Sequence, residues 1–403
     1  MLREKSSYKD VTKHILDKMP DIGKWQYYFI LETFGLFLSI KGRLNFLGLA
    51  RYGKRGEQHY RSRFAKDFDF LSFNVELAVQ HGSEEFTIAF DPSYVNKSGK
   101  ATPGVGYFWS GVSGRAKWGL EMSGIAAIDI QGHTAFHLES VQTPGELGSK
   151  SFPDHYGDLL VDRKQQLLPL SKYVVADAYF SKHGFTSKLV ANGFELVSRL
   201  RNDADLNYKY VGVQKKGRGR PKKYDGKVLF AQLREEHFEC LEENEECKIY
   251  QGKVYSKSLK RDINLVVVKT LKKGKWGHKL YFSTDLDLSG RTLLDYYRKR
   301  FQIEFIFRDA KQHAGLEHCQ ARSTEKLHFH WNASLTAVNL AKAAHWFPLP
   351  KQERGAFSMS DVKTLYNNDL MLKRFLCVFA IDPNRPKNTE KIRQLLTYGA
   401  RAA

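Results

Sequence analysis

The sequence predicts an α/β fold in which helices pack on a mixed sheet, a β-rich insertion interrupts the sheet, and helical segments flank it. Three observations predict this arrangement. Apolar residues recur at helical spacing up to about residue 80 and again after about residue 330. Between about 84 and 204, short apolar segments rich in β-formers alternate with helical segments. From about 205 to 280, the patterns are mostly strand-like.

The N-terminal segment is expected to be helical. Apolar residues recur through VTKHILDKM, QYYFILETFGLFLSI and RLNFLGLA, with Gly and Pro as breakers between them. LNFLGLARYGKRGEQHYRSRFAK has the pattern of a helix, a basic turn that contains glycine, and a basic helix. This is the outline of a helix-turn-helix, whose second helix would present Arg61, Arg63 and Lys66 to DNA. The alternative is an ordinary helical subdomain with a solvated basic face.

Two acidic residues end predicted strands in the next region. The strand in EEFTIAFD ends on Asp91 and precedes a Pro-Ser turn, and KYVVADAYF has a buried-strand pattern with Asp177. Further strands are predicted in GVGYFWSG, SGIAAIDI, HTAFHLESV and FELVSRL, and helices in DHYGDLLVDRKQQLL and SKHGFTSKLVANG. In α/β sheets, polar groups at the carboxyl ends of strands line the site. Asp91 and Asp177 are therefore candidate site residues.

The predicted insertion follows. KKGRGRPKKYDG is basic and punctuated by Gly and Pro, which indicates a loop. ECKIYQGKVYS, DINLVVVKTL and HKLYFSTD are predicted to be mostly β, and we expect the chain to return to the main sheet near KLYFSTD. KVLFAQLREEHFECLEENEE is ambiguous, with an acidic end that suits a solvated face.

The segment KGRGRPKK within that loop has Arg-Gly-Arg-Pro flanked by lysines. It resembles an AT-hook, in which an extended Arg-Gly-Arg lies in an A·T minor groove. A plain solvated loop is one alternative, and contact with DNA phosphate without sequence preference is the interpretation that we favour.

The net charge indicates a polyanionic partner. The chain has 403 residues, a formal charge of +20 and a pI of about 9.6. A membrane is excluded, because the most apolar run carries Glu32, Lys41 and Arg43 and has no uncharged stretch near the ~20 residues that span a bilayer. The N-terminus lacks the apolar core of a signal peptide. We therefore expect a soluble intracellular protein.

The cysteines and histidines do not predict a zinc site. The four cysteines, at 240, 247, 319 and 377, form no C-x-x-C pair, and so few suit a reducing compartment. His318, Cys319, His328 and His330 lie close in sequence, but zinc sites need about four ligands in recognisable pairs. We expect these histidines to be hydrogen-bonded or at the surface.

DYYRKRFQIEFIFRDAK, residues 295–311, is predicted to be one helix with a charged stripe. At about 100° per residue, the stripe spans an arc of roughly 60° and contains Tyr297, Arg300, Glu304 and Lys311, with Arg308 close beside them. Apolar side chains occupy the remaining directions, so much of the helix should be buried. The stripe is either a salt-bridged polar seam or a surface that faces phosphate and a metal ion.

Glu304 and the two strand-end aspartates form a set of three candidate acids. Cleavage or transfer at a DNA phosphodiester needs charge stabilised on the entering and leaving oxygens, which two divalent ions roughly 3.5–4 Å apart provide. Mg²⁺ prefers oxygen ligands and keeps several waters, so three carboxylates suit its coordination. Four other acids compete for these roles: Asp129, Asp158 and Asp162 for the first two, and Glu317 for the third.

The spacing Tyr-x-x-Arg-x-x-x-Glu-x-x-x-x-x-x-Lys over 297–311 resembles the signature of bacterial insertion-sequence transposases of the DDE superfamily, Y-R-E-K branch. ADAYF, with Asp177, resembles that family's second-Asp motif, and FDPSYVNKSGK, with Asp91, resembles its first more loosely. The order of helical front, interrupted core and β-insertion is also similar, so the resemblance covers nearly the whole chain. It implies a ribonuclease-H-like core.

The resemblance implies a role for each candidate residue. Asp91, Asp177 and Glu304 would be catalytic and would hold two Mg²⁺ ions, for which Mn²⁺ could substitute. Three residues of the stripe would grip the DNA backbone near the cleaved end: Tyr297, Arg300 and Lys311. Members of this branch cut through a hairpin intermediate and place a flipped base against a tryptophan of the insertion. Trp276 is the candidate, although we expect it to be a buried structural residue.

The implied function is a transposase that binds terminal inverted repeats and performs metal-dependent cleavage and strand transfer by a cut-and-paste route. Its implied partners are double-stranded DNA, as transposon ends and target, and a second copy of the chain, as a dimer on DNA. Its implied location is the bacterial cytoplasm, with the nucleoid. Two alternatives stay open: a domesticated, catalytically silent DNA-binding regulator, and a ribonuclease-H-like DNA repair or junction nuclease. The predicted regions are 1–80 (helical, DNA-binding), 81–204 (catalytic core, first part), 205–280 (β-rich insertion), 281–330 (catalytic core, second part) and 331–403 (helical).

Overall fold

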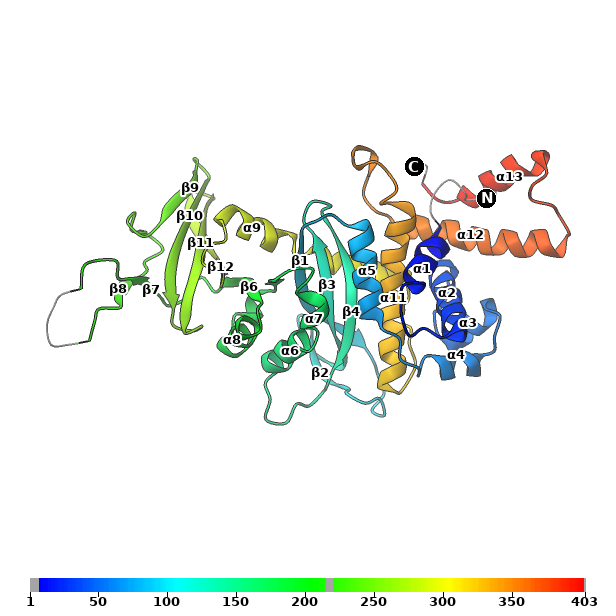
Figure 1. Ribbon diagram of the computed structural model, residues 1–403, viewed down its shortest axis with the longest axis horizontal. Helices are drawn as coiled ribbons and strands as arrows, with labels where there is room; N and C mark the ends of the chain where they lie inside the picture. Colours follow the sequence, from blue (N-terminus) through cyan, green and yellow to red (C-terminus); the bar gives the residue numbers. More distant parts are fainter. Residues whose placement is uncertain (1–6, 215–219, 402–403) are drawn as a thin grey trace.

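The structure is a computed structural model that describes residues 7–214 and 220–401. The molecule is elongated, with a β-rich module at one end, a sheet-and-helix core in the middle, and the N- and C-terminal helices together at the other end (Figure 1). The helices are α1 (Tyr8–Leu16), α2 (Lys24–Ser39), α3 (Phe46–Tyr52), α4 (Glu57–Arg63), α5 (Phe70–His81), α6 (Phe152–Val161), α7 (Lys164–Leu167), α8 (His183–Ala191), α9 (Gly290–Lys299), α10 (Gln302–His313), α11 (Thr324–His345), α12 (Met359–Val378) and α13 (Pro386–Thr397), with 3₁₀ turns η1 (Ala178–Phe180) and η2 (Lys351–Glu353). The strands are β1 (Phe86–Asn96), β2 (Gly106–Ser110), β3 (Arg115–Asp129), β4 (Thr134–Thr143), β5 (Tyr173–Val175), β6 (Glu195–Leu200), β7 (Leu206–Lys209), β8 (Tyr224–Lys227), β9 (Glu239–Glu243), β10 (Cys247–Ser256), β11 (Arg261–Lys272) and β12 (Lys275–Ser283).

The core sheet has the strand order β4-β3-β1-β5-β6. Strands β1, β3 and β4 pair antiparallel, while β5 pairs parallel with both β1 and β6. An antiparallel set joined to two parallel strands is the ribonuclease-H-like mixed sheet that the sequence predicts. The central strands are buried along most of their length, as their apolar runs require.

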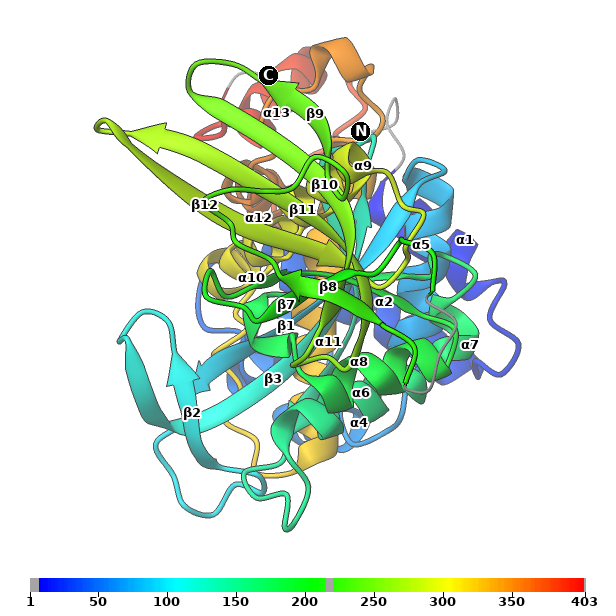
Figure 2. The ribbon, with the colours of Figure 1, turned by 90° about the vertical axis from the view of Figure 1, so that its left-hand side faces the viewer.

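The insertion is continuous with the core sheet. Strand β12 pairs antiparallel with β6, from Leu280 opposite Leu200 to Ser283 opposite Val197. The sheet then continues through β11, β10, β7 and β8, so core and insertion form one sheet. The predicted return of the chain near KLYFSTD is confirmed. Figure 2 shows the long strands of the insertion extending beyond the core.

Helix α11 covers one face of the core sheet and is buried along nearly its whole length (Figure 1). Two of its buried asparagines bond to β4. The Asn332 amide donates to the Ser140 carbonyl at 2.9 Å and accepts from the Ser140 amide at 2.8 Å. Asn339 contacts the backbone of His137 in the same way, at 2.7 and 2.9 Å. These paired bonds fix the register of α11 on the sheet, because breaking one would leave a buried polar group without a hydrogen-bond partner.

The N-terminal segment is helical, as predicted, and α3 and α4 are joined by a turn over 53–56. The buried Tyr60 hydroxyl donates to Glu32 on α2 at 2.8 Å, which anchors α4. Arg61 is held by Glu57 and lies over the Phe46 ring at 4.9 Å. Arg61, one of the three basic residues predicted to face DNA, therefore has partners within the helical subdomain.

Several local predictions are wrong. No turn follows Asp91, since β1 continues through Pro92 and Ser93 to Asn96. At Pro92, β5 no longer pairs with β1, so this side of β1 is open. Proline has no backbone N–H to donate, and an open strand edge tolerates that loss. KYVVADAYF is a strand only over 173–175 and then forms η1. Finally, Trp276 is not buried, since 46% of it is exposed.

The predicted helix over 295–311 is two helices. Helix α9 ends at Lys299 and α10 begins at Gln302, with Arg300 and Phe301 as the cap residues between them. The backbone there makes tight bonds three residues apart, such as Ile303 N–H to the Arg300 carbonyl at 3.2 Å. This break divides the charged stripe between two helices, with Tyr297 on α9 and Glu304 and Lys311 on α10.

Two remaining segments complete the fold. KVLFAQLREEHFECLEENEE consists mainly of turns, with parts of β8 and β9 at its ends. The C-terminal region is helical, as predicted. None of the helices in the described part of the chain combines the length and apolar character needed to span a membrane.

Candidate active site

Asp91 and Asp177 lie at the same end of the two central parallel strands. The last parallel register pair of β1 and β5 is Ala89 opposite Val175. Each aspartate follows two residues later, so both stand just beyond the point where the two strands part. Asp177 is held in place on both sides: its carboxylate accepts from the Tyr179 amide at 2.9 Å, and its carbonyl accepts from the Ser198 hydroxyl at 2.8 Å.

Glu304 reaches this edge from α10, which packs against β1 and β3. Gly124 on β3 lies opposite Asp91 and makes this approach possible. A Cβ added to Gly124 would lie 2.5 Å from the Phe307 ring of α10, far inside van der Waals contact. The absence of a side chain at Gly124 therefore allows α10 to lie close to the strand that carries Asp91.

Arg300 lies between two of the predicted acids. Its guanidinium is 3.6 Å from the Asp91 carboxylate and 3.0 Å from the Glu304 carboxylate. The Arg300 and Asp91 side chains are 15% and 21% exposed, whereas Glu304 is 53% exposed. Asp91 and Glu304 raise the pKa of Arg300, although burial acts against its charge. Part of the charged stripe is thus a salt-bridged seam, as one of the two interpretations predicted.

The negative charge at this edge exceeds what Arg300 neutralises. Burial raises the pKa of Asp91 to about 7; Arg300 opposes this rise, and the carboxylates of Asp177, Glu304 and Glu121 add to it. The other three carboxylates therefore lie close enough to Asp91 to disfavour its ionised form. Such repulsion favours an additional cation, which would stabilise the ionised carboxylates.

The donor set fits divalent metal ions that prefer oxygen. Asp91, Asp177 and Glu304 offer carboxylate oxygens, and one Arg300 guanidinium nitrogen is buried without a hydrogen-bond partner in the described residues. A guanidinium with free bonding capacity can turn toward phosphate oxygens when a metal ion neutralises the acids. The three acids do not bring ligand atoms within 4.8 Å of one another as one group, so a metal would draw them together.

The other two residues of the stripe differ in their surroundings. The Tyr297 ring packs edge-on against Tyr281 at 5.0 Å, and burial raises its pKa despite the nearby Arg300 and Arg199. Lys311 donates to the Tyr94 carbonyl at 2.9 Å and lies 3.4 Å from the Glu317 carboxylate. Lys311 thus contacts the backbone of β1 beyond Asp91, at the edge of the site.

The competing acids have structural partners. Asp129 accepts from the amides of Ser83 and Gly132 at 3.0 and 2.7 Å, and Asp158 pairs with Lys188 and Lys150. Asp162 occupies the C-cap position of α6, where its backbone amide donates to the Asp158 and Leu160 carbonyls. The carboxylates of Asp129 and Asp158 thus have partners other than the three candidate acids.

Two residues of the site were not predicted from the sequence. Glu121 on β3 is buried, accepts from the Tyr156 hydroxyl, and has a pKa raised by burial. Arg199 on β6 has a buried Nε without a partner in the described residues and lies near Tyr297. A single acid within the apolar run of β3 was a usable signal for Glu121.

The histidines considered for zinc are hydrogen-bonded, as predicted. His318 accepts from the Leu44 amide at 3.1 Å, and His330 contacts the Gly315 carbonyl at 2.8 Å. His328 contacts Glu139 at 3.2 Å. They connect elements of the helical end of the molecule.

Comparisons with known proteins relate part of the chain to a protein family. Residues 154–340 match the family model described as the transposase DDE domain, a range that contains Asp177 and Glu304 but not Asp91. No curated protein matches the chain significantly. A cryo-EM structure of the piggyBac transposase synaptic complex with hairpin DNA aligns with 100% of this chain and 84% of that chain, at 10% identity and a TM-score of 0.40. That score is too low to add to the assignment, which depends on the family match. Residues 154–340 of this chain are therefore similar to the transposase DDE domain family.

Proposed function

We propose that this protein is a cut-and-paste transposase that binds terminal inverted repeats, cleaves DNA at them, and joins the released ends to a target. The observation that carries the proposal is the convergence of Asp91, Asp177 and Glu304 around Arg300, with two of the acids inside the family match. The spacing of Tyr297, Arg300, Glu304 and Lys311 supports membership of the Y-R-E-K branch.

In this proposal, Asp91, Asp177 and Glu304 hold two divalent ions, Mg²⁺ or Mn²⁺. When bound, such ions stabilise charge on the attacking and leaving oxygens of an in-line displacement at phosphorus. The protein's own contribution is to position these three carboxylates. β1 and β5 fix the two aspartates at one sheet edge, and α10 brings Glu304 to them through the close approach at Gly124.

Arg300, Tyr297 and Lys311 would hold the DNA backbone beside the reacting phosphate. Arg300 has unused donor capacity, and a planar guanidinium suits two phosphate oxygens at once. Burial raises the pKa of the Tyr297 hydroxyl, and the charges of Arg300 and Asp177 act on it as well. A phosphate between these groups would place its scissile bond next to the acids.

Other basic and aromatic groups would extend the DNA contact. Lys66 on the segment after α4 is exposed, and Arg220 borders the loop of the insertion. Lys215, Lys216 and Arg218 of the AT-hook-like segment lie outside the described residues. The exposed Trp276, with Lys248 at 5.6 Å from its ring, is suited to stack on a flipped base.

Pairing two transposon ends requires at least two copies of the chain, so we propose a dimer on DNA. The proposal is tested with purified protein, a duplex that carries the ends of the encoding element, and Mg²⁺. The expected products are cleavage at the element boundary and insertion into target DNA with a short flanking duplication. Binding without cleavage would favour the silent regulator, and cleavage of branched DNA without regard to sequence would favour the repair nuclease.

A further inference from the structure

The β-rich insertion contains a second group of potential metal ligands, remote from the three acids in sequence. Asp225 lies on β8, and Glu236 and His237 lie in the turn that leads to β9. One ligand atom from each lies within 4.8 Å of the other two. Within 7–214 and 220–401, no other set of three His, Cys, Asp or Glu side chains meets this criterion.

His237 points to a ligand by its own surroundings. Its side chain is only 3% exposed, and its Nε2 is buried without a hydrogen-bond partner among the described residues. That nitrogen lies 3.9 Å from the Asp225 carboxylate, which is too far for a hydrogen bond. Burying an imidazole nitrogen with no partner is unfavourable. A ligand between Nε2 and the carboxylates would remove that cost.

The imidazole is also held in a fixed orientation. The His237 ring stacks on Tyr208 of β7, with 4.6 Å between centroids and 26° between planes. The Tyr208 hydroxyl accepts from the Arg234 amide at 3.2 Å, and the His237 amide donates to the Arg234 carbonyl at 3.1 Å. The sheet and the turn therefore aim Nε2 before any ligand arrives, which favours binding.

The carboxylates of Asp225 and Glu236 differ in the cations that neutralise them. Asp225 lies 2.7 Å from Lys222 and 3.3 Å from Arg234, so both cations neutralise it. Glu236 is exposed and forms no hydrogen bond or ion pair with any described residue. Its side chain is free to move toward His237 and Asp225. Tetrahedral ligands about 2.0–2.1 Å from an ion lie about 3.3 Å apart, so the group must contract by no more than about 1.5 Å.

We propose that Asp225, Glu236 and His237 bind a divalent transition-metal ion, with Zn²⁺ as the best fit. One imidazole and two carboxylates match zinc ligand chemistry, whereas Mg²⁺ and Ca²⁺ prefer oxygen ligands alone. A fourth position would be taken by water. The site is independent of the proposed transposition chemistry and uses none of its residues.

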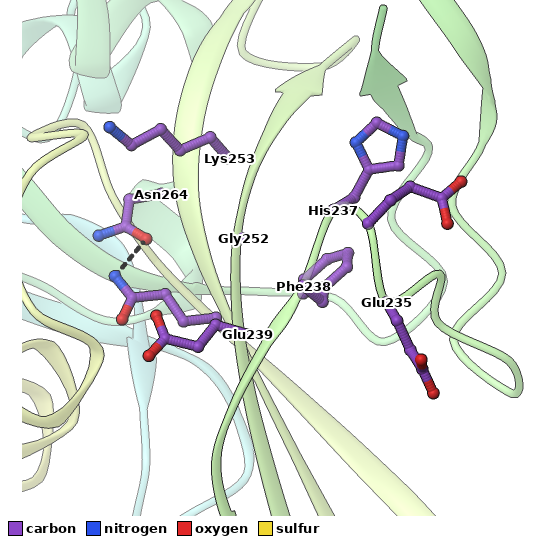
Figure 3. Close-up of a pocket in the computed structure, with 9 residues that line it drawn as sticks. Glu235, His237, Phe238, Glu239, Gly252, Lys253 and Asn264 are labelled. Atoms are coloured by element: carbon purple, nitrogen blue, oxygen red, sulfur yellow. Dashed lines mark hydrogen bonds between the residues drawn. The ribbon is translucent and has the colours of Figure 1, made fainter. Parts of the chain in front are cut away.

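The turn that carries Glu236 and His237 also borders a pocket. Glu236 and His237 line a pocket of about 400 Å³ beside β10, together with Glu235 and Glu239 (Figure 3). In that view, the His237 ring and the Glu235 side chain project from the same turn in different directions. Glu235 and Glu239 share the pocket but lie outside the ligand group, so they serve as matched controls.

The bound ion would change the surroundings of the basic loop. Asp225 follows the loop directly, and its present partner Lys222 belongs to the KGRGRPKK segment. A divalent ion would replace Lys222 and Arg234 as the counter-charge of Asp225. It would thereby fasten β8 to the turn before β9 and release two cations beside the loop.

The site is tested on the full chain with Asp91→Asn, Asp177→Asn and Glu304→Gln present, which removes the other carboxylate set. Zn²⁺ binding to metal-free protein is measured by calorimetry, and Co²⁺ by its visible absorption spectrum. We expect one Zn²⁺ per chain, and a loss of affinity of at least about tenfold, or ~1.4 kcal/mol, in Asp225→Asn and in Glu236→Gln. Glu235→Gln and Glu239→Gln should bind as the parent does.

Glu236 is exposed and has no partner in the part of the chain that the structure describes, so Glu236→Gln should fold normally. The thermal unfolding midpoint without metal will verify this. Zn²⁺ should raise that midpoint in the parent and not in Glu236→Gln. The proposal is overturned if the parent binds no stoichiometric Zn²⁺. It is also overturned if Glu236→Gln binds normally, or if Glu235→Gln weakens binding as much as Glu236→Gln does.

Discussion

The guanidinium of Arg300 lies 3.6 Å from the carboxylate of Asp91. A side chain that was expected to hold DNA is therefore also a counter-ion of the proposed metal ligands. The two roles are compatible if a metal ion takes over the neutralisation of the acids and leaves Arg300 free to bind phosphate. Metal affinity and DNA affinity should then respond in opposite ways to changes at Arg300.

Arg300→Gln should bind Mn²⁺ more tightly than the parent protein when DNA is absent. The variant loses a cation that competes with the metal, and a tenfold gain would correspond to about 1.4 kcal/mol of removed repulsion. Electron paramagnetic resonance can measure free Mn²⁺ in such a titration. DNA affinity should fall in the same variant and be partly restored in Arg300→Lys. Weaker Mn²⁺ binding in Arg300→Gln would contradict the assigned arrangement.

Gly124→Ala should reduce cleavage much more than it reduces stability. The new methyl group would meet the Phe307 ring at 2.5 Å and force α10, with Glu304, away from Asp91. Overpacking of this kind costs about 1–3 kcal/mol in unfolding free energy. Phe307→Leu in the same chain should recover part of the activity. Gly111→Ala, where a Cβ would meet open space, is the matched control for both assays.

Replacing the loop cations Lys215, Lys216, Arg218 and Arg220 by Gln should weaken DNA binding and flatten its salt dependence. Each phosphate contact contributes about 0.9 to the slope of log affinity against log salt, so the loss of four contacts would reduce the slope by about 3.6. Affinity measured between low and moderate salt checks this. An unchanged slope would show that the loop does not contact phosphate, whereas selective loss on A·T-rich ends would support the AT-hook interpretation.

Lys363 should make stability depend on pH above neutrality. Burial lowers the pKa of Lys363 to about 7, and its ammonium donates to the Phe37 carbonyl at 2.5 Å. In the unfolded chain its pKa is about 10.4, so between pH 7 and 10 the unfolded state binds more protons and stability rises with pH. Lys363→Met should lack this rise, whose full size is a few kcal/mol at most. Its unfolding free energy relative to the parent should therefore decline from pH 7 to pH 10.

The exposed Lys373, which pairs with Asp369, provides the control for that measurement. Lys373→Met should follow the pH dependence of the parent. A constant difference between Lys363→Met and the parent across this pH range would show that Lys363 is not buried as a neutral amine.

Much of the candidate site could be predicted from the sequence, because its parts depend on local pattern. The apolar runs before Asp91 and Asp177 predict buried strands, and the two aspartates do lie together at one edge of the sheet. One of the two interpretations of the charged stripe, a salt-bridged seam, describes the contact of Arg300 with Glu304. These features follow from periodicity, which a single sequence displays directly.

The parts that could not be predicted depend on contacts between distant segments. Strand β1 continues past Pro92 because β5 has already ended, and this depends on the relative lengths of two strands far apart in the chain. Glu121 joins the site only through the antiparallel pairing of β3 with β1. His237 lies in the segment whose pattern was ambiguous, and its stacking on Tyr208 has no sequence signature. Tertiary packing decides each of these.

The most direct test of the central claim compares DNA cleavage and DNA binding in single acid variants. Asp91→Asn, Asp177→Asn and Glu304→Gln keep the shape of each side chain and remove one charge. Each should still bind the element-end duplex, because Arg300 and Lys311 remain. Glu317→Gln, which alters only the partner of Lys311 at 3.4 Å, should bind and cleave nearly as the parent does.

Cleavage in Mg²⁺ should fall by about 10³-fold or more in each of the three variants, equivalent to ~4 kcal/mol in the barrier. The measurement is the single-turnover cleavage rate under saturating protein. Loss of cleavage with retained binding in all three, and normal cleavage in Glu317→Gln, is the result that the three-acid site predicts. Normal cleavage by Glu304→Gln together with an inactive Glu317→Gln would assign the third acid to Glu317, and normal cleavage by all four variants would show that the three-acid site does not exist.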